Sequence, residues 1–485
     1  MAHRRAAGAT PAPLAAAALA VLLLAGCATF SADGGFGAVQ AVAKERLDKE
    51  VKWVRDQSDA DSVRAMVAKL LAAPLSPEDA VQIALLNNKG LQAVYADLGI
   101  SEANLVQAGR LRNPGLSYSR ASAGGELKME RLIVFDFLQF LTMPLAVKIE
   151  GQRFEQAKMR VANEMLGVAA ATRRAYYDAL GAEQTARYRE QVKDAAEAAA
   201  ELARRMARAG NLSRVDQARE QVFYAEATAE LAAARQRAVA EREKLARLLG
   251  LWGEDLAFKL PERLPELPGA KPELHDVEAS AIANRLDIQA AKRDTEALAE
   301  SLGLTKATRF INVLEIGDWR TVETPDPRKR GYSIILEVPL FDWGGARVAM
   351  AEAMYMQSVS RLAEAAVNAR SEVREAYSAY LTAYELARHY RDEIVPLRKK
   401  ISEENQLRYN AMLISVFELL ADAREQVASV NAYIGALRDF WAADADLQMA
   451  LAGAPPAGTV GHLMRDRGPG GERQLDPRRQ PRRGD

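Results

Sequence analysis

The stretch YSIILEVPLFDWGG, from Tyr332 to Gly345, contains the pattern that decides the fold. A large apolar side chain stands at every second position from Tyr332 to Val338, with Ser333 and Glu337 between them. This period of two is typical of a strand with one apolar face. The proline and glycines that follow cannot continue the strand, so the sequence predicts a strand, a turn and then a new element.

Two very long helices are predicted, from about Val147 to Arg208 and from about Arg347 to Arg408. Apolar positions recur through both at steps of three and four, and Pro396 is the one helix-stopping residue. A helix of about sixty residues is about 90 Å long and must pack beside another helix. Because Gly210-Asn211 and Asn410-Ala411 then break the pattern, we expect two antiparallel α-hairpins, one of them kinked at Pro396.

The chain is an internal duplication with a spacing of about two hundred residues. Each half predicts a medium helix, two strands, a long helix, a tight turn and a returning helix. We assign residues 76–259 to the first repeat, 260–272 to a proline-rich linker and 273–453 to the second repeat. Five pairs of segments match in order: Leu91-Gln92-Ala93 with Ile288-Gln289-Ala290, Met143-Pro144-Leu145 with Val338-Pro339-Leu340, Ala175-Tyr176 with Ala376-Tyr377, Ala218-Arg219-Glu220-Gln221 with Ala423-Arg424-Glu425-Gln426, and Leu248-Leu249-Gly250 with Leu451-Ala452-Gly453.

The remaining elements of the repeats follow from local signals. The sequence Ser76-Pro77-Glu78-Asp79 predicts a helix start, and the helix should run to about Ala108. Apolar and serine residues alternate over Leu116–Ser119, and an apolar run covers Leu132–Leu141, which predicts two strands. In the second repeat, the strand that pairs with Tyr332–Val338 is expected over Phe310–Trp319.

The two flanks of the repeats have different compositions. Residues 27–75 should be a lipid-anchored tether, with a short helix between Gly34 and Ala73. Residues 454–485 are rich in Pro, Gly and Arg, with seven Arg against four acidic residues, which predicts a disordered basic tail.

Residues 1–26 have the features of a secretion signal. Arg4 and Arg5 precede an apolar run from Leu14 to Leu24, which is too short to span a bilayer comfortably. The sequence Leu24-Ala25-Gly26-Cys27 resembles the bacterial lipobox, in which the cysteine becomes the acylated first residue of the mature protein. Cys27 is also the chain's single cysteine. The alternative is an ordinary cleaved signal with an incidental cysteine.

No later stretch has the 18 or more apolar residues of a transmembrane helix, so a spanning chain would have to use strands. A spanning sheet must leave no lipid-exposed edge, and four strands per chain are too few to close a barrel. Several chains must therefore share one barrel. The polar loops at 121–129 and 320–331 should face outside.

Composition argues against nucleic acid and catalysis. The chain has 65 basic and 65 acidic residues, so it lacks the charge excess that neutralises phosphates. The histidines are too dispersed for metal-ligand spacing, and no catalytic or cofactor-binding arrangement stands out. Met350, Met354 and Met356 could bind a soft metal, but packing is the better interpretation at helical spacing. We expect no cofactor and no metal.

Over residues 76–453 the chain resembles the TolC-type outer-membrane efflux proteins. The segment Val338-Pro339-Leu340-Phe341-Asp342-Trp343-Gly344-Gly345 is similar to the strand-to-helix turn of that family, and Asn284-Arg285-Leu286-Asp287-Ile288 to the start of its second-repeat helix. The resemblance implies a mainly α fold with a small β part. It also implies a homotrimer with a twelve-stranded outer-membrane barrel and a periplasmic helical tunnel, docked to a periplasmic adaptor and an inner-membrane pump.

The resemblance also assigns residues at the ends of the hairpins. Glu418 stands where the family usually has an acidic residue at the periplasmic aperture, and Asp216 has the similar place in the first repeat. Met412 replaces the family's usual turn glycine. The candidate adaptor-docking tips are Gly210, Asn211, Leu212 and Ser213, and Asn410, Ala411, Met412 and Leu413.

The sequence therefore predicts a channel in the outer membrane of a Gram-negative bacterium, anchored by lipid such as palmitate at Cys27. As the exit duct of a tripartite efflux system, it would pass small molecules such as drugs or metal ions, energised by a partner pump. Two alternatives stay open: the exit duct of a type I protein secretion system, and a lipid-anchored periplasmic coiled-coil scaffold without a pore.

Overall fold

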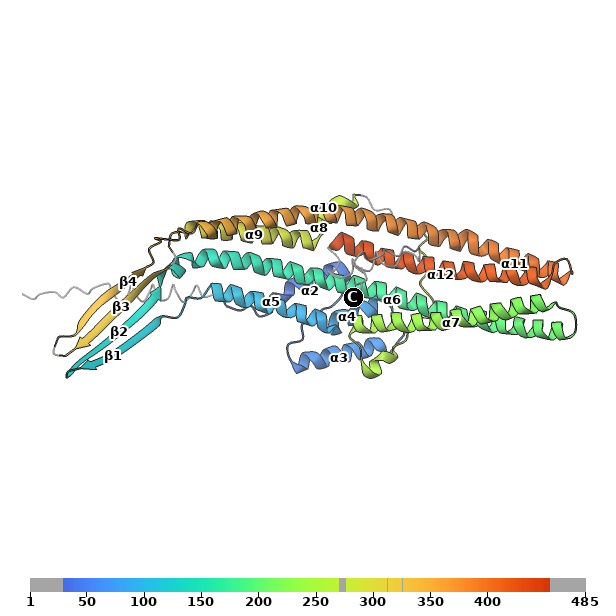
Figure 1. Ribbon diagram of the computed structural model, residues 1–485, viewed down its shortest axis with the longest axis horizontal. Coiled ribbons are helices and arrows are strands. Elements are labelled where there is room, and N and C mark those ends of the chain that lie inside the picture. The colour runs from blue at the N-terminus through green and yellow to red at the C-terminus, as the bar shows by residue number, and fades with distance from the viewer. Residues whose placement is uncertain (1–28, 270–275, 312, 325, 454–485) are drawn as a thin grey trace, which may run out of the picture. The chain divides into compact units, whose positions relative to one another are not determined.

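The computed structural model describes residues 29–269, 276–311, 313–324 and 326–453 (Figure 1). The described chain is mainly helical with one small sheet, as predicted. The signal segment, Cys27, the end of the linker and the basic tail lie outside these ranges. The elements, in chain order, are α2 (Phe36–Leu47), α3 (Gln57–Leu71), α4 (Pro77–Asn87), α5 (Lys89–Ala108), β1 (Gly115–Ala123), β2 (Glu126–Asp136), α6 (Phe137–Arg208), α7 (Arg214–Leu249), η1 (Gly253–Ala257), α8 (Val277–Asn284), α9 (Leu286–Ala307), β3 (Leu314–Glu323), β4 (Lys329–Leu336), α10 (Gly345–His389), the π-helical segment η2 (Tyr390–Ile394), α11 (Val395–Asn410) and α12 (Val416–Ala452).

The strands form one antiparallel sheet in the order β1-β2-β3-β4. One hairpin comes from each repeat, and the central pairing joins β2 to β3, with Leu132 opposite Trp319. The two repeats therefore share the sheet. Strands β1 and β4 form its edges, and no strand of the described chain pairs with their outer sides.

Two predicted strands are shifted in the structure. The strand predicted over Leu132–Leu141 covers Glu126–Asp136, because the Asp136 carboxylate accepts the Gln139 N–H at 2.9 Å and caps α6. The partner strand predicted over Phe310–Trp319 covers Leu314–Glu323, because the turn that follows α9 extends to Ile311.

The predicted helix from Ser76 to Ala108 is broken at Asn88. Its start is confirmed, since Ser76 and Asp79 form a reciprocal capping box at α4. At the break, the Asn88 side chain accepts the Leu91 N–H at 2.9 Å and donates to the Leu248 carbonyl at 2.8 Å. The break thereby starts α5 and ties it to the end of α7.

Arg285 stands at the equivalent break between α8 and α9. Its side chain is only 1% exposed and donates to the carboxylates of Asp287 and Glu372, each at 2.8 Å. It also donates to the Ala450 carbonyl at 3.2 Å, near the end of α12. Both repeats therefore bond this break to the end of their returning helix, with different side chains.

The long helices form the two predicted α-hairpins (Figure 1). Helix α6 has 72 residues, which is about 108 Å at 1.5 Å per residue. It begins at Phe137, before the predicted start at Val147. In the second repeat, α10 and α11 are joined by the π-helical turn η2, directly before Pro396. Because proline has no N–H to donate, the helix adjusts locally through this π-helical turn, beside the proline at which we predict a kink.

The core lies where helices of both repeats meet. Tyr176 of α6 and Tyr384 of α10 are nearly fully buried in one apolar cluster. The linker packs against this cluster: the Tyr384 hydroxyl donates to the Pro268 carbonyl at 3.2 Å, and the Trp441 indole N–H donates to the Pro265 carbonyl at 3.0 Å. The described part of the linker is non-helical, as predicted, and also contributes to the core.

The segment between Gly34 and Ala73 holds two helices, α2 and α3, where a tether with one short helix was predicted. Phe36 of α2 packs edge to face against Tyr95 of α5, with ring centroids 4.9 Å apart. Phe36, Val39 and Ala43 recur at helical spacing and are buried. This apolar face attaches the segment to the first repeat.

Candidate functional site

One face of the sheet is apolar and exposed. Residues directly opposite each other in an antiparallel pair project to the same side, and the register places Leu116 opposite Ile133 and Phe135 opposite Ile316. We call the side that carries these four residues the apolar face. Its large exposed side chains are Leu116, Tyr118, Ile133, Phe135, Ile316, Tyr332, Ile334 and Leu336. Ile335 is an exposed apolar side chain of the opposite side.

The opposite side, the polar face, mixes small and charged side chains with a few apolar ones. Trp319 packs over Gly331, where a Cβ atom would lie 3.2 Å from the indole. Lys128 and Glu130 form an ion pair of 2.9 Å on β2. Further residues of this face are Ser117, Ser119, Glu315, Glu323, Lys329 and Ser333. One side of the sheet is thus suited to an apolar solvent and the other to water.

The strand-to-helix turn of the second repeat contains Pro339, Leu340, Phe341, Asp342, Trp343 and Gly344, the residues selected from the sequence. The Asp342 carboxylate accepts the Gly344 N–H at 2.8 Å. Gly344 has a φ of +71°, and a Cβ atom there would lie 2.5 Å from the Arg309 carbonyl oxygen. The turn therefore requires glycine, whereas the first repeat passes from β2 into α6 through the Asp136 cap alone.

The first hairpin tip, Gly210 to Ser213, is a compact turn between α6 and α7. The Gly210 N–H donates to the Ala207 carbonyl at 3.1 Å, and the Asn211 N–H donates to the Met206 carbonyl at 2.9 Å. With Gly210 in the left-handed region, at a φ of +78°, this is a Schellman-type helix end. Ser213 then caps α7.

The second tip repeats this geometry two residues later than the sequence assigned it. The Met412 N–H donates to the Tyr409 carbonyl and the Leu413 N–H to the Arg408 carbonyl, both at 2.9 Å. Met412 has a φ of +59° and so adopts the backbone conformation of the glycine it replaces. The residues equivalent to Gly210–Ser213 are therefore Met412–Ser415, while Asn410 and Ala411 belong to the end of α11.

The acidic candidates Asp216 and Glu418 occupy equivalent places in the two returning helices. The Ser415 N–H donates to Glu418 at 2.9 Å, and the Glu418 N–H donates to the Ser415 hydroxyl at 3.3 Å, which completes a capping box. Asp216 likewise donates its N–H to Ser213, at 3.1 Å, and it pairs with Arg219 at 3.1 Å. Both carboxylates thus stabilise a helix start.

A contact between the two hairpins lies farther from the tips. Arg424 of α12 donates to the buried Glu220 of α7 at 3.1 Å, and its guanidinium lies 4.2 Å from the centre of the Phe223 ring. Arg398 of α11 pairs with Glu425 at 3.0 Å. The Arg424–Glu220 bond joins the two returning helices, and the Arg398–Glu425 pair joins the two helices of the second hairpin.

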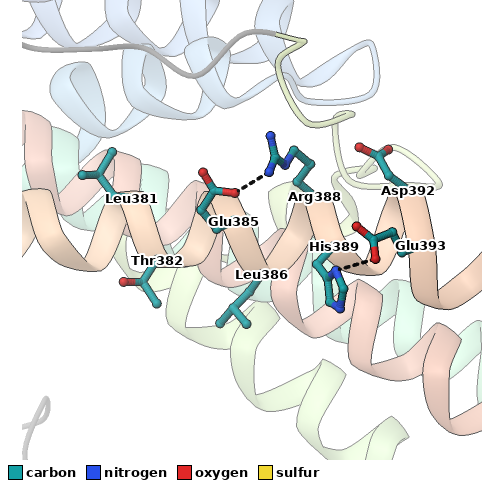
Figure 2. A pocket seen from close by; sticks show the side chains of 8 residues that line it. All are labelled: Leu381, Thr382, Glu385, Leu386, Arg388, His389, Asp392 and Glu393. Carbon is teal, nitrogen blue, oxygen red and sulfur yellow. Dashed lines mark ion pairs between the residues drawn. The ribbon is translucent and has the colours of Figure 1, made fainter.

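Figure 2 shows a charged hollow on α10 and η2, lined by Leu381, Thr382, Glu385, Leu386, Arg388, His389, Asp392 and Glu393. Arg388 pairs with Glu385 at 2.9 Å, and His389 with Glu393 at 3.3 Å. A hydrogen bond from Arg391 holds the pKa of Asp392 below its usual value. Since these side chains largely pair with one another along the helix, the hollow offers no convergent set of ligand groups.

Metal-ligand clusters and membrane-spanning helices are both absent from the described ranges. No group of three or more His, Cys, Asp or Glu side chains there could hold a metal ion. Met350, Met354 and Met356 are exposed on α10, so the packing interpretation is wrong within this single chain. None of the described helices combines the length and apolarity that crossing a bilayer requires.

Residues 279–453, which include β3, β4 and the second α-hairpin, match the family described as outer membrane efflux protein. Over these residues the chain is similar to this family. The predicted resemblance is thereby confirmed, and the motif around Pro339 and the hairpin tip at Met412 lie inside the matched range. No curated protein sequence matches the chain.

Solved structures share the fold at low identity. A membrane protein from Pseudomonas aeruginosa is 20% identical, with a TM-score of 0.65, and the match covers 80% of this chain and 92% of that one. The Campylobacter jejuni CmeC outer membrane channel is 14% identical, with a TM-score of 0.66, covering 85% and 92%. The open-state Neisseria gonorrhoeae MtrE outer membrane channel is 17% identical, with a TM-score of 0.64, covering 78% and 88%. The predicted mainly α fold with a small β part is confirmed.

Sequence reasoning found the first hairpin tip, the Ser76 cap and the Gly344 turn, but it did not bring the strands of the apolar face together. Alternation identified Tyr332, Ile334 and Leu336 on β4. It did not connect them to Ile316 or Phe135, because that connection depends on the pairing of β2 with β3 across the repeats. Pairing between distant strands has no local signal in a sequence.

Proposed function

We propose that three copies of this efflux-family chain form the outer-membrane exit duct of a tripartite efflux system, which passes small molecules such as drugs or metal ions. A periplasmic adaptor and an inner-membrane pump would be its partners, and the pump would supply the energy. The observation that carries this proposal is a four-stranded sheet with an apolar face and two open edges, continued by two long α-hairpins.

The open edges of β1 and β4 support assembly. An unpaired edge inside a bilayer leaves backbone N–H and C=O groups without partners, at a cost of several kcal/mol each. Pairing β4 of one copy with β1 of the next removes both edges. Three copies give the twelve strands that the family resemblance implies.

The hairpins support a periplasmic duct with a docking end. Helix α6 starts directly after β2, so the tube wall would continue from the barrel without a gap. At the far ends, Leu212, Met412 and Leu413 belong to the short turns, and Met412 is 93% exposed. The exposed apolar side chains of the second turn suit contact with an adaptor, whereas Leu212 of the first turn is half-buried.

Acylation of Cys27 would attach each copy to the inner leaflet of the outer membrane. A single acyl chain gives only marginal, reversible binding. In this proposal the lipid delivers and steadies the chain, and the strands carry the spanning role.

Purified protein tests the assembly and the pore together. Detergent-extracted protein should migrate as a trimer that dissociates on heating, and it should conduct ions in a planar bilayer. A monomer whose migration does not change with heat and that shows no conductance would contradict the duct and favour the scaffold.

Crosslinking tests the docking end. A photo-crosslinker on Asn211→Cys should capture a periplasmic adaptor, whereas the same label on Thr324→Cys, in the β3–β4 connection, should not. Capture from neither position would count against docking at the tips. The pump that co-purifies decides between the duct classes: a proton-driven pump supports efflux, and a peptide-exporting ATPase supports type I secretion.

A further inference from the structure

Four arginines form a row across the sheet, one from each strand. The register places Arg131 of β2 opposite Arg320 of β3, and Arg320 opposite Arg330 of β4. Arg120 of β1 lies opposite Met129, two residues from Arg131 on the same side of β2. Strands are about 4.8 Å apart, so the row extends over about 14 Å. We call these residues the arginine row.

The arginine row belongs to the apolar face. Arg131 lies opposite Tyr118 and shares its side with Ile133, while Arg330 shares its side with Tyr332. All four guanidinium-bearing side chains are exposed. Along the strands, the row lies between the large exposed side chains of the apolar face and the hairpin turns. This is the end of the sheet that points away from the helices (Figure 1).

The row has an excess of positive charge. On this face of the described strands, Asp318 is the acidic residue, and it accepts from Arg320 at 2.9 Å and from Arg330 at 3.3 Å. Within the described chain, no carboxylate pairs with Arg120 or Arg131, although Arg131 lies 5.8 Å from the centre of the Tyr118 ring. One carboxylate against four guanidinium groups leaves the face strongly cationic.

A cationic row on a lipid-facing surface is restricted to one depth in a membrane. An arginine at the bilayer midplane of a barrel costs about 2–4 kcal/mol, and the cost falls to about 0–1 kcal/mol near the interface. The row should therefore lie at the headgroups, where Tyr118 and Tyr332 beside it match the aromatic girdle of such barrels. Guanidinium groups bind phosphate through two parallel hydrogen bonds.

We propose that the arginine row binds the phosphate groups of a phosphorylated glycolipid of the outer leaflet, the chemistry of lipopolysaccharide. This inference rests on the proposed function, since it needs the sheet to span the outer membrane with its hairpin turns outside. Charge complementarity selects this occupant over a neutral lipid. Three copies would repeat the row around the barrel.

The test compares two double variants of the trimer that remove equal charge from the same two strands. Arg131→Gln with Arg330→Gln removes half of the row, and Lys128→Gln with Lys329→Gln removes two cations from the polar face. Lipopolysaccharide binding to detergent-solubilised trimer is measured by its mobility shift. We expect about tenfold weaker binding for the arginine pair, equivalent to one lost charged hydrogen bond, and unchanged binding for the lysine pair.

Several outcomes would overturn the proposal. Equal binding by the arginine variant and the wild type would exclude the row, and equal loss in the lysine variant would indicate a general charge effect. Inhibition by millimolar inorganic phosphate to the same extent as by the glycolipid would assign the row to free phosphate. If the arginine pair does not assemble, the single change Arg120→Gln at the edge strand carries the same test.

The proposed duct function and the proposed glycolipid binding can be rejected independently. Bilayer conductance reports the proposed function, and glycolipid binding reports the row. A wild-type trimer that conducts but does not bind the glycolipid rejects only the row, and wild-type protein that binds it without conducting rejects only the duct.

Discussion

At the scale of single residues, the two hairpin turns differ in one costly position. Gly210 and Met412 both adopt a left-handed backbone with equivalent hydrogen bonds. Glycine adopts this conformation freely, whereas a residue with a Cβ atom pays roughly 1 kcal/mol or more. Because Met412 is almost fully exposed, packing within the chain does not offset this cost. We infer that the side chain is retained for a contact outside the chain.

We therefore expect Met412→Gly to stabilise the second tip by about 1 kcal/mol. Amide hydrogen exchange of the peptide containing Leu413 should slow in the variant. Gly210→Ala is the matched control in the first tip and should have the opposite effect, with faster exchange around Asn211. Faster exchange in both variants would mean that the left-handed conformation is not the source of the cost.

The acidic residue Glu418 has a helix-capping role that is separable from a channel role. Glu418→Gln keeps an oxygen that accepts the Ser415 N–H but removes the charge, whereas Ser415→Ala removes the cap and keeps the charge. If three copies of Glu418 surround the aperture, the Gln variant should lower cation preference in single-channel recordings. Ser415→Ala should instead cost about 1 kcal/mol of helix stability and leave the preference unchanged. A Gln variant with wild-type selectivity would remove the aperture role.

At the scale of elements, the sequence predicted each type of element but several boundaries only roughly. The apolar run Leu132–Leu141 was interpreted as one strand, because a continuous apolar run does not distinguish a strand from a buried helix. The Asp136 cap divides it. The breaks at Asn88 and Arg285 also escaped prediction, since their partners Leu248 and Ala450 are distant in sequence. The Ser76 cap and the glycine turns at Gly210 and Gly344, whose signals are local, were predicted.

Adjacent residues of β4 lie on opposite faces of the sheet, so a pair of neighbouring substitutions tests which face contacts lipid. Ile334 projects from the apolar face and Ser333 from the polar face. In a membrane barrel, Ile334→Asp would place a carboxylate against lipid and destabilise the sheet, while Ser333→Asp would place it against water. We expect the Ile334 variant to lose heat-dissociable trimer. The Ser333 variant should assemble and show altered ion selectivity.

Reversal of this pair would assign the faces the other way round. If Ser333→Asp blocks assembly and Ile334→Asp does not, the apolar face lines the interior, and the arginine row could not contact lipid. The same two samples would therefore test the orientation on which the glycolipid proposal depends.

At the scale of the whole molecule, the two repeats are joined in two regions of different chemistry. Backbone pairing of β2 with β3 joins them in the sheet, and a buried aromatic core with the linker joins them among the helices. The core needs only one chain, whereas no strand of the described residues covers the sheet edges that the proposed assembly would pair. Folding of the helical part should therefore precede assembly of the barrel.

Two variants test the role of the lipid anchor separately from the role of the barrel. Cys27→Ser removes the predicted acylation site and leaves every strand intact, so fewer copies should reach the outer membrane, but those that assemble should conduct normally. Leu336→Asp keeps the anchor and places a charge on the apolar face, at the end of β4 that leads through the turn to α10. This variant should be acylated and sorted but should form no conducting trimer. Membrane fractionation measures sorting, heat-dependent migration measures assembly, and bilayer recording measures the pore. If Cys27→Ser abolished conductance per trimer while Leu336→Asp preserved it, the anchor and not the barrel would be the essential feature.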